Sequence, residues 1–422
     1  ISQTGALSSQ SITVNGGASV TQTGGNGTGN KAWFYNLGLT QSLTFSAGGA
    51  LNLQGGTGGS DNSASFNSEG AAATAQTISF TGGGAINILG GTVGNKNYAE
   101  VFAKTGNQTV NGNPNITSTG GASGGAGGDF ANAAVIVLDR GTGTQTINAG
   151  TISLIGGAGG NFNLAAILTD GNGQSQIVNT TGNVTIAGGA GIDALAGIFG
   201  TGNATLTVGG NLSLTGGSGA TGTFGPIAIV GAVDSAVNLI ANVQGGVTLN
   251  KGTTGDAIIG STNISSGPVA VNAGLSGSGN IALNAGRVLT TGNVSLQANN
   301  ATGQITQTAG GVINANVLTT ASRNGTLLAS GFNSFAAFVG TNSTTGDIVA
   351  NNNSGAAYDF SATNSAVGGN IGSAGAGGTL VVPVGGKVQS NGGSIALGAA
   401  AVNVSAAGAN AINTTNNGAT PA

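Results

Sequence analysis

The 422-residue sequence contains no cysteine, histidine or methionine. Without cysteine it can form no disulfide framework and carry out no thiol catalysis, and Cys/His metal sites are excluded. Only 5% of the residues are charged, and the eight lysines and arginines are scattered singly. Because nucleic-acid binders need clustered basic residues to contact the phosphate backbone, we expect no nucleic-acid partner.

Long apolar runs and prolines are also scarce. No window of 18 consecutive apolar residues exists, so no transmembrane helix is expected. There are only five prolines and glycine does not fall at every third position, which excludes collagen. The 85 glycines would suit a disordered linker, but 39% of the residues are hydrophobic and alternate with polar residues in short runs, as in β-strands. The chain begins at Ile1 without a basic and apolar leader, so we interpret it as a processed protein or a segment of a longer one.

Six glutamines in the first half of the chain each precede an aliphatic residue by two positions. They are Gln10, Gln41, Gln76, Gln108, Gln145 and Gln176, at intervals of 31, 35, 32, 37 and 31 residues. A period of about 20–50 residues is typical of stacked repeats, each of which buries its apolar face against its neighbours. We expect these side chains to form an amide ladder from one repeat to the next. The alternative is that glutamine only tolerates the turn that starts a strand.

Each repeat reads as three short strands joined by glycine-rich turns. The first strand follows the glutamine, as in Leu43-Thr44-Phe45; the second alternates, as in Leu51-Asn52-Leu53; the third begins at an alanine, as in Ala64-Ser65-Phe66. Glycine pairs such as Gly55-Gly56 close the second strand, and we expect them to adopt positive φ values at a sharp corner. The predicted fold is all-β, a right-handed parallel β-helix (β-solenoid) with about three strands per ~32-residue coil.

The spacing of the repeats along the sequence divides the chain into three parts. We predict regular long coils over residues 1–267, a continuation with shorter repeats over 268–402, and an irregular C-terminal tail or cap over 403–422. In the second part, strands such as Gly279–Leu283 and Gly292–Leu296 recur every 11 to 13 residues. We interpret them as single strands on successive faces with tighter corners.

One segment, Gly188–Leu195, matches the calcium-binding nonapeptide G-G-x-G-x-D-x-U. Partial copies one coil earlier and two coils earlier place Asp129, Asn161 and Asp193 in one expected column. Calcium sites of that kind need tandem nonapeptides, and two carboxylates with one amide are few ligands for Ca²⁺. Hydrogen bonding by Asx side chains at a corner explains the column as well. We therefore keep these three residues as weak calcium candidates and expect no other metal, cofactor or catalytic residue.

The third strands suggest a contact surface. Alignment at their alanines places Phe34, Phe66, Val101 and Val135 in a core column, which turns Trp33 and Tyr35 outward. This aromatic pair is a candidate contact for a glycan or a neighbouring subunit; the alternative is that it packs under a loop or covers the first coil. Later third strands are continuously apolar, as strands buried on both faces are, so we expect an outer apolar stripe covered by a lateral neighbour or by the C-terminal part of the chain. The members expected in this stripe are Ile136, Leu138, Leu168 and Phe199.

The region after residue 302 contains a series of short stretches: Gly303–Ala315, Val317-Leu318, Gly325–Leu328, Asn333–Phe338 and Gly346-Asp347-Ile348. The opening Ile1–Ala6 is similar to the first of them. This series resembles the repeat region of filamentous-haemagglutinin-like large exoproteins. The resemblance covers about a quarter of the chain. It implies a β-helical surface protein of the two-partner secretion type, exported by Gram-negative bacteria and used for adhesion, aggregation or matrix building.

The sequence as a whole favours an extracellular structural or adhesive protein of the bacterial cell surface, self-associating into fibres or lateral assemblies and contacting glycans or a cell surface. Catalysis finds little support, because the eleven acidic residues are spread over the chain and Asp139-Arg140 is the only adjacent acid–base pair. The alternative is a polysaccharide-binding or polysaccharide-cleaving β-helix protein.

Overall fold

A computed structural model describes residues 1–70, 75–123, 131–171, 173–233, 237–262, 267–375, 377–405 and 411–414. Within these residues the regular structure is entirely β, and the paired strands run parallel to one another. The all-β, parallel and repeating organisation expected from the sequence is therefore confirmed. No helix in the described part of the chain is long and apolar enough to cross a membrane.

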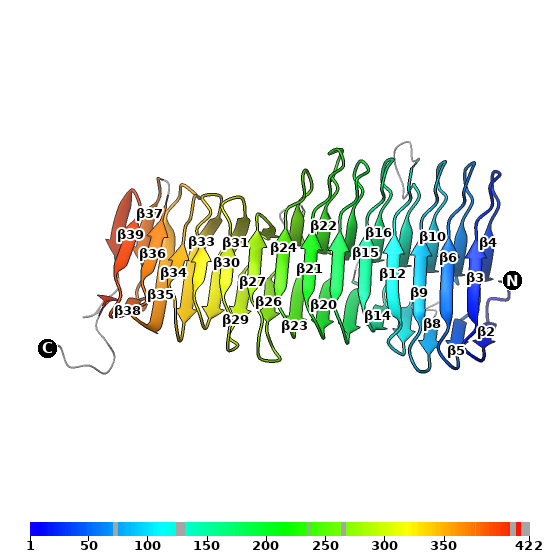
Figure 1. Cartoon of the computed structure of the whole chain (residues 1–422), viewed down its shortest axis with the longest axis horizontal. Coiled ribbons are helices and arrows are strands. Elements are labelled where there is room, and N and C mark those ends of the chain that lie inside the picture. Colours follow the sequence, from blue (N-terminus) through cyan, green and yellow to red (C-terminus); the bar gives the residue numbers. More distant parts are fainter. Residues whose placement is uncertain are drawn as a thin grey trace. The chain divides into compact units, whose positions relative to one another are not determined.

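The chain forms two compact units (Figure 1). Unit 1 comprises Ile1–Asn238 and Asn250–Thr262, and unit 2 comprises Leu239–Leu249 and Asn263–Ala422. The change of rhythm that the sequence shows near Pro268 lies within unit 2.

Unit 1 is built from three series of strands, and each strand pairs with the equivalent strand of the next repeat. The first series is β2 (Ser9–Val14), β5 (Thr40–Phe45), β8 (Ala75–Phe80), β11 (Asn107–Asn111), β14 (Thr144–Ala149), β17 (Ser175–Thr180) and β20 (Asn203–Val208). The second is β3 (Ser19–Thr23), β6 (Ala50–Gln54), β9 (Ala85–Leu89), β12 (Asn115–Thr119), β15 (Ile152–Ile155), β18 (Val184–Ala187) and β21 (Leu212–Thr215). The third is β1 (Ser2–Gln3), β4 (Ala32–Asn36), β7 (Ala64–Ser68), β10 (Ala99–Ala103), β13 (Ala134–Leu138), β16 (Ala165–Thr169), β19 (Ala196–Phe199), β22 (Ala228–Ala232) and β25 (Ala257–Ser261).

The register of these pairs places equivalent residues of successive repeats next to one another. Leu43 pairs with Ile78, and Ile78 with Val110, in the first series. We call such a set of paired residues a row. Because strand side chains alternate between two faces, an in-register stack presents one set of rows to the interior and the other to the outside.

The interior rows of unit 1 form a continuous apolar core. Leu43 and Phe45 of β5 are fully buried, as are Leu51 and Ile86 of the second series. The rings of Phe45 and Phe80 lie parallel with centroids 4.5 Å apart. Each repeat therefore buries its aliphatic and aromatic side chains against the repeats on either side, which replaces the single globular core that this length would suggest.

The glycine pairs are required for close packing rather than for positive φ. Neither Gly55 nor Gly56 has a positive φ, which corrects the expectation from the sequence. A Cβ on Gly56 would lie 2.3 Å from the Cβ of Asn62, and one on Gly55 would lie 2.0 Å from the carbonyl oxygen of Asn97. Glycine is needed here because the backbones of neighbouring loops approach too closely for any side chain.

Unit 2 has shorter repeats. Ile281 pairs with Ile305 and Thr326 with Ile348, so equivalent residues lie about 21 to 24 positions apart. In the repeats of β31, β33 and β35 two strands merge into a single long one, since β31 pairs with both β28 and β29, and β35 with both β37 and β38. The strands are β23 (Asn238–Val243), β24 (Val247–Asn250), β26 (Val269–Ala273), β27 (Ile281–Asn284), β28 (Arg287–Leu289), β29 (Val294–Ala298), β30 (Ile305–Gln307), β31 (Val312–Ser322), β32 (Thr326–Leu328), β33 (Ser334–Asn342), β34 (Ile348–Ala350), β35 (Tyr358–Val367), β36 (Ile371–Ala374), β37 (Thr379–Val382), β38 (Val388–Asn391), β39 (Ile395–Gly398), β40 (Ala401–Val404) and β41 (Ile412–Asn413).

Candidate functional site

The third strands of unit 1 have an outer face, defined by the rows that point away from the apolar core. One of these rows contains Trp33, Ser65 and Glu100, and another contains Tyr35, Asn67 and Phe102. Although the chain is poor in charge, several charged residues lie on or beside this face. They include Lys31, Lys96, Lys104, Arg140, Glu69, Glu100, Asp139, Asp170 and Asp193.

An aromatic pair occupies the part of the outer face over β4. The rings of Trp33 and Tyr35 are half-buried and stacked, with centroids 5.5 Å apart and planes inclined by 23°. Trp33 Nε1 donates a hydrogen bond to Ser63 Oγ (3.0 Å), and the Tyr35 hydroxyl donates one to Glu69 Oε2 (3.4 Å). The Lys31 ammonium lies 4.5 Å from the centroid of the Trp33 ring. Partial burial and the Glu69 charge raise the pKa of Tyr35, so its hydroxyl stays a neutral donor.

Glu100 is the most strongly perturbed acid of the outer face. Burial is the main cause that raises the pKa of its carboxyl to about 7, while a hydrogen bond from Ser65 Oγ to Oε1 (2.9 Å) opposes this shift. The carboxyl is therefore close to half-protonated at neutral pH and can both donate and accept a hydrogen bond. Burial and the nearby Glu100 charge likewise raise the pKa of Tyr98 to about 12.

A first cavity, which we call cavity A, lies on the outer face over β10 and β13. Its volume is about 320 Å³, and Tyr98, Glu100 and Asp139 line it together with Lys96. The apolar part of the lining consists of Phe102, Ala133, Val135, Val137 and Leu168, and Asp170 also lines the cavity. Asp139 also pairs with Arg140 (Oδ2 to Nε 3.0 Å), whose side chain is 76% exposed.

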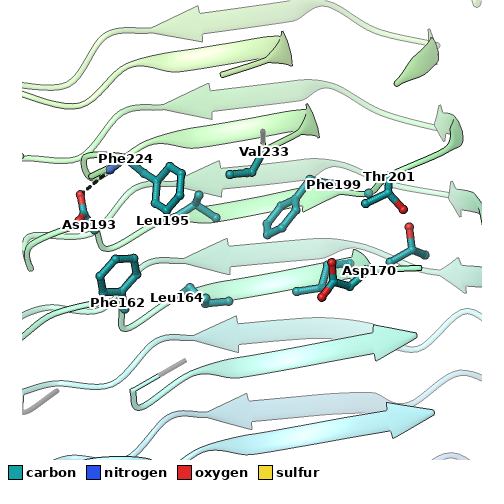
Figure 2. Close-up of a pocket in the computed structure, with 12 residues that line it drawn as sticks. Phe162, Leu164, Asp170, Asp193, Leu195, Phe199, Thr201, Phe224 and Val233 are labelled. Atoms are coloured by element: carbon teal, nitrogen blue, oxygen red, sulfur yellow. Dashed lines mark hydrogen bonds between the residues drawn. The ribbon is translucent and has the colours of Figure 1, made fainter. Parts of the chain in front are cut away.

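A second cavity, cavity B, adjoins the first, because Leu168 and Asp170 line both. Its volume is about 290 Å³. Figure 2 shows Phe162 and Phe224 at one end, Leu195 and Phe199 along the side, and Asp170 with Thr201 at the other end. The Phe162 and Phe224 rings meet edge to face with centroids 6.2 Å apart. Cavity B is thus largely apolar along its length, with Asp170 and Thr201 at one end and Asp193 beside the phenylalanines at the other.

The calcium candidates do not form a column. Asn161 is bridged to Ile192, one residue before Asp193, so Asn161 and Asp193 lie in different rows. The Asp193 carboxylate is already occupied, because it accepts hydrogen bonds from the backbone N–H groups of four consecutive residues, Gly222 to Gly225. Asp193 therefore makes corner hydrogen bonds, which was the alternative to calcium binding for this residue. Asp129 lies outside the described residues, and no group of three or more acidic side chains within them is arranged to hold a metal ion.

The six glutamines lie in one interior row at the corner between the third strand and the next first strand. Each amide nitrogen donates to the amide oxygen of the previous glutamine, as Gln41 does to Gln10 (2.8 Å) and Gln108 to Gln76 (2.8 Å). The same nitrogen also donates to backbone carbonyls of the neighbouring third strands; for Gln108 these belong to Val101 and Val137. The remaining links join Gln76 to Gln41, Gln145 to Gln108, and Gln176 to Gln145.

A row of asparagines forms a second ladder that sequence reasoning did not find. The backbone N–H of Asn62 donates to Asn97 Oδ1 (2.9 Å), and that of Asn97 donates to Asn132 Oδ1 (2.9 Å). Asn30 and Asn163 extend the row in the same way. The sequence does contain this pattern, since an asparagine stands one or two residues before the alanine of most third strands. Only the spacing of the glutamines was used to predict a ladder.

The outer apolar stripe expected from the sequence requires a correction. Ala134, not Ala133, pairs with Ala99, which places Ile136 in the core row of Val101. Ile136 and Leu138 are therefore core residues with no exposed surface, because a register shift of one residue exchanges the two faces of a strand. Val135 and Val137 take the outer positions, whereas Leu168 and Phe199 do lie on the outer face, where they line cavity B. The loops that carry Phe162 and Phe224 lie over the outward-facing side chains of Leu168 and Phe199.

Comparison with known proteins gives no relative for this chain: no family model, no curated protein and no solved structure matches it. The outer face with its two cavities is therefore the candidate site on structural grounds alone. Of its residues, the sequence singled out Trp33, Tyr35, Leu168 and Phe199, and Asp193 in another role, but it gave no role to Tyr98, Glu100 or Asp170.

Proposed function

We propose that the chain is an extracellular structural and adhesive protein of the bacterial cell surface, folded as a right-handed parallel β-helix with three strands per coil and related in type to filamentous-haemagglutinin-like exoproteins. The observation that carries this proposal is the in-register stacking of equivalent strands, with hydrogen-bonded glutamines from Gln10 to Gln176 inside the stack. Right-handedness is the expectation for parallel strands joined by crossover connections.

The chemistry of the stack supports a scaffold. Side-chain amides and backbone ladders satisfy many polar groups of the interior, and the apolar rows pack directly against one another. Such a stack can keep exposed side chains at a fixed spacing, which is what an adhesive surface requires. Secretion and attachment to the cell surface complete the proposal.

Self-association into fibres or lateral assemblies is part of the same proposal. Within the described residues, β2 pairs only with β5, and β3 pairs only with β6. In a stack of this kind, a strand that is paired on one side can pair on the other side with a strand of another chain. A second copy that adds at this edge would continue the same parallel pattern.

Electron microscopy and light scattering of the purified chain test this proposal. We expect filaments or lateral bundles whose formation depends on protein concentration, and clumping of beads that carry the chain. Thr21→Pro in β3 should reduce both, because proline removes a backbone donor from the edge strand; Thr221→Pro, in a loop far along the chain, is the matched control. Particles that remain single at every concentration and do not clump beads would overturn self-association and the fibre.

A second candidate function is polysaccharide binding, and the aromatic pair over β4 favours it. Trp33 and Tyr35 offer stacked rings beside hydrogen-bonding groups of Ser63 and Glu69, the combination of ring face and fixed polar groups that sugars need. Polysaccharide cleavage would be a further step, in which the half-protonated Glu100 would act as the proton donor.

A glycan array followed by an assay for new reducing ends separates these possibilities. If the aromatic pair binds sugar, Trp33→Ala should weaken binding about 10-fold or more and Trp33→Phe much less. Val93→Ala, which truncates a side chain that is 52% exposed, is the control. No bound glycan on a broad array would remove this candidate, and binding without new ends would limit it to recognition.

A further inference from the structure

Cavity B is a built space that neither the scaffold nor the glycan proposal uses. It lies over β16 and β19 and is closed at one end by Phe162 and Phe224, which come from loops of two different repeats (Figure 2). Its volume of about 290 Å³ is near the lower end for small-molecule sites, which usually have apolar walls and a few polar groups at fixed places.

We propose that cavity B binds a small amphiphilic amine, with an aromatic or branched apolar group between the phenylalanine rings and an ammonium group at Asp170. The assignment combines the shape of the cavity with the kind of residue at each end. It goes beyond the proposed surface function and does not depend on it.

The apolar end determines what kind of body the ligand has. Leu164, Leu195 and Phe199 line this part together with the two loop phenylalanines, and Val233 contributes from a later repeat. Phe162, Phe199 and Phe224 are only half-buried, so their rings have surface left to bury against a ligand. Sugar hydroxyls would lose hydrogen bonds to water here without replacement, whereas an aromatic ring or alkyl group gains from burial.

The polar end determines the charge of the ligand. Asp170 lines both cavities, and no residue that the structure describes donates a hydrogen bond to its carboxylate. Asp139 of cavity A adds a second negative charge nearby, and burial together with this charge raises the pKa of Asp170. The Arg140 charge opposes this rise in the pKa of Asp170, but the Arg140 side chain is 76% exposed and already pairs with Asp139.

Two other polar side chains of cavity B are already engaged. Asp193 accepts four backbone N–H groups, and the Thr201 hydroxyl donates to the carbonyl of Gly171 (2.7 Å). Asp170 is therefore the carboxylate left to meet a ligand. Asp170 is exposed, so a bound ammonium would take the place of water at this carboxylate and would reduce its repulsion with Asp139.

Three probes with one apolar body and different heads test the proposal by isothermal titration calorimetry. They are 4-phenylbutylamine, 4-phenyl-1-butanol and 4-phenylbutyrate. We expect the amine to bind at least about 10-fold more tightly than the alcohol, and the acid to bind more weakly than the alcohol, because one charge-assisted hydrogen bond is worth roughly that factor.

Two variants and one control locate the binding site. Asp170→Asn should reduce the affinity for the amine to that for the alcohol and leave the alcohol unchanged. Thr201→Trp, at the half-exposed polar end, should weaken all three probes by filling the space, with folding checked by circular dichroism. Asp359→Asn removes the same charge from an exposed site in unit 2 and should change nothing.

Each alternative result overturns the proposal. Equal binding of the three probes would show that charge plays no part, and an unchanged amine affinity in Asp170→Asn would place the ammonium elsewhere. Absence of amine binding to the unaltered, folded chain at millimolar concentration would remove the site altogether. None of these results bears on fibre formation, so the surface function stands or falls separately.

Discussion

At the scale of single residues, Glu100 ties stability to pH. Burial raises the pKa of its carboxyl from 4.5 to about 7, so between these pH values the folded chain holds a proton that the unfolded chain has released. Stability should therefore fall as the pH rises through this window and stay lower above it. Glu100→Gln cannot ionise, and we expect it to be more stable than the unaltered chain by about 1–3 kcal/mol at pH 8 and equally stable at pH 4.

Urea unfolding at pH 4, 6 and 8 measures this difference. The midpoint of the unaltered chain should decrease relative to that of Glu100→Gln as the pH rises, while Asp359→Asn, at an exposed site, should follow the unaltered chain at all three values. Parallel curves for Glu100→Gln and the unaltered chain would mean that this carboxyl ionises as easily in the folded state as in water.

At the scale of strands, the glutamine row joins neighbouring repeats through side chains as well as backbones. Gln108 donates to Gln76 and to the carbonyls of Val101 and Val137, and it accepts from Gln145. Gln108→Leu keeps the side chain buried but leaves these groups without partners, at a cost of about 2–4 kcal/mol. Thermal or urea unfolding should show the loss, and Gln297→Leu, at an exposed position of β29, should be close to neutral. Equal stability of both variants would show that water replaces the ladder at no cost.

The same strands show how far sequence reasoning reaches. Period-two alternation and equal spacing identified Leu43, Ile78 and Val110 as neighbours, because each of these strands has one apolar face. The continuously apolar segment before Leu138 has no polar residue to mark its outer face, so its register was one residue off and Ile136 was placed outside. The site was harder to predict still. Cavity B depends on loops that bring Phe162 and Phe224 from different repeats over one strand pair, and no local pattern encodes that meeting.

At the scale of the whole molecule, stacking predicts how stability is distributed within unit 1. Each strand of unit 1 pairs with the equivalent strands of the adjacent repeats. A strand with two partners, such as β9, should therefore gain more protection than β3, for which β6 is the one partner among the described residues. Hydrogen exchange followed by mass spectrometry should show amides in β9 exchanging at least about 10-fold more slowly than those in β3. The Gln108→Leu variant extends the test, because loss of protection should be greatest in β8, β11 and β14 and should fade toward β2 and β20. A uniform loss of protection across unit 1 would show instead that the stack unfolds as one cooperative body, in which removing one glutamine link destabilises all repeats equally.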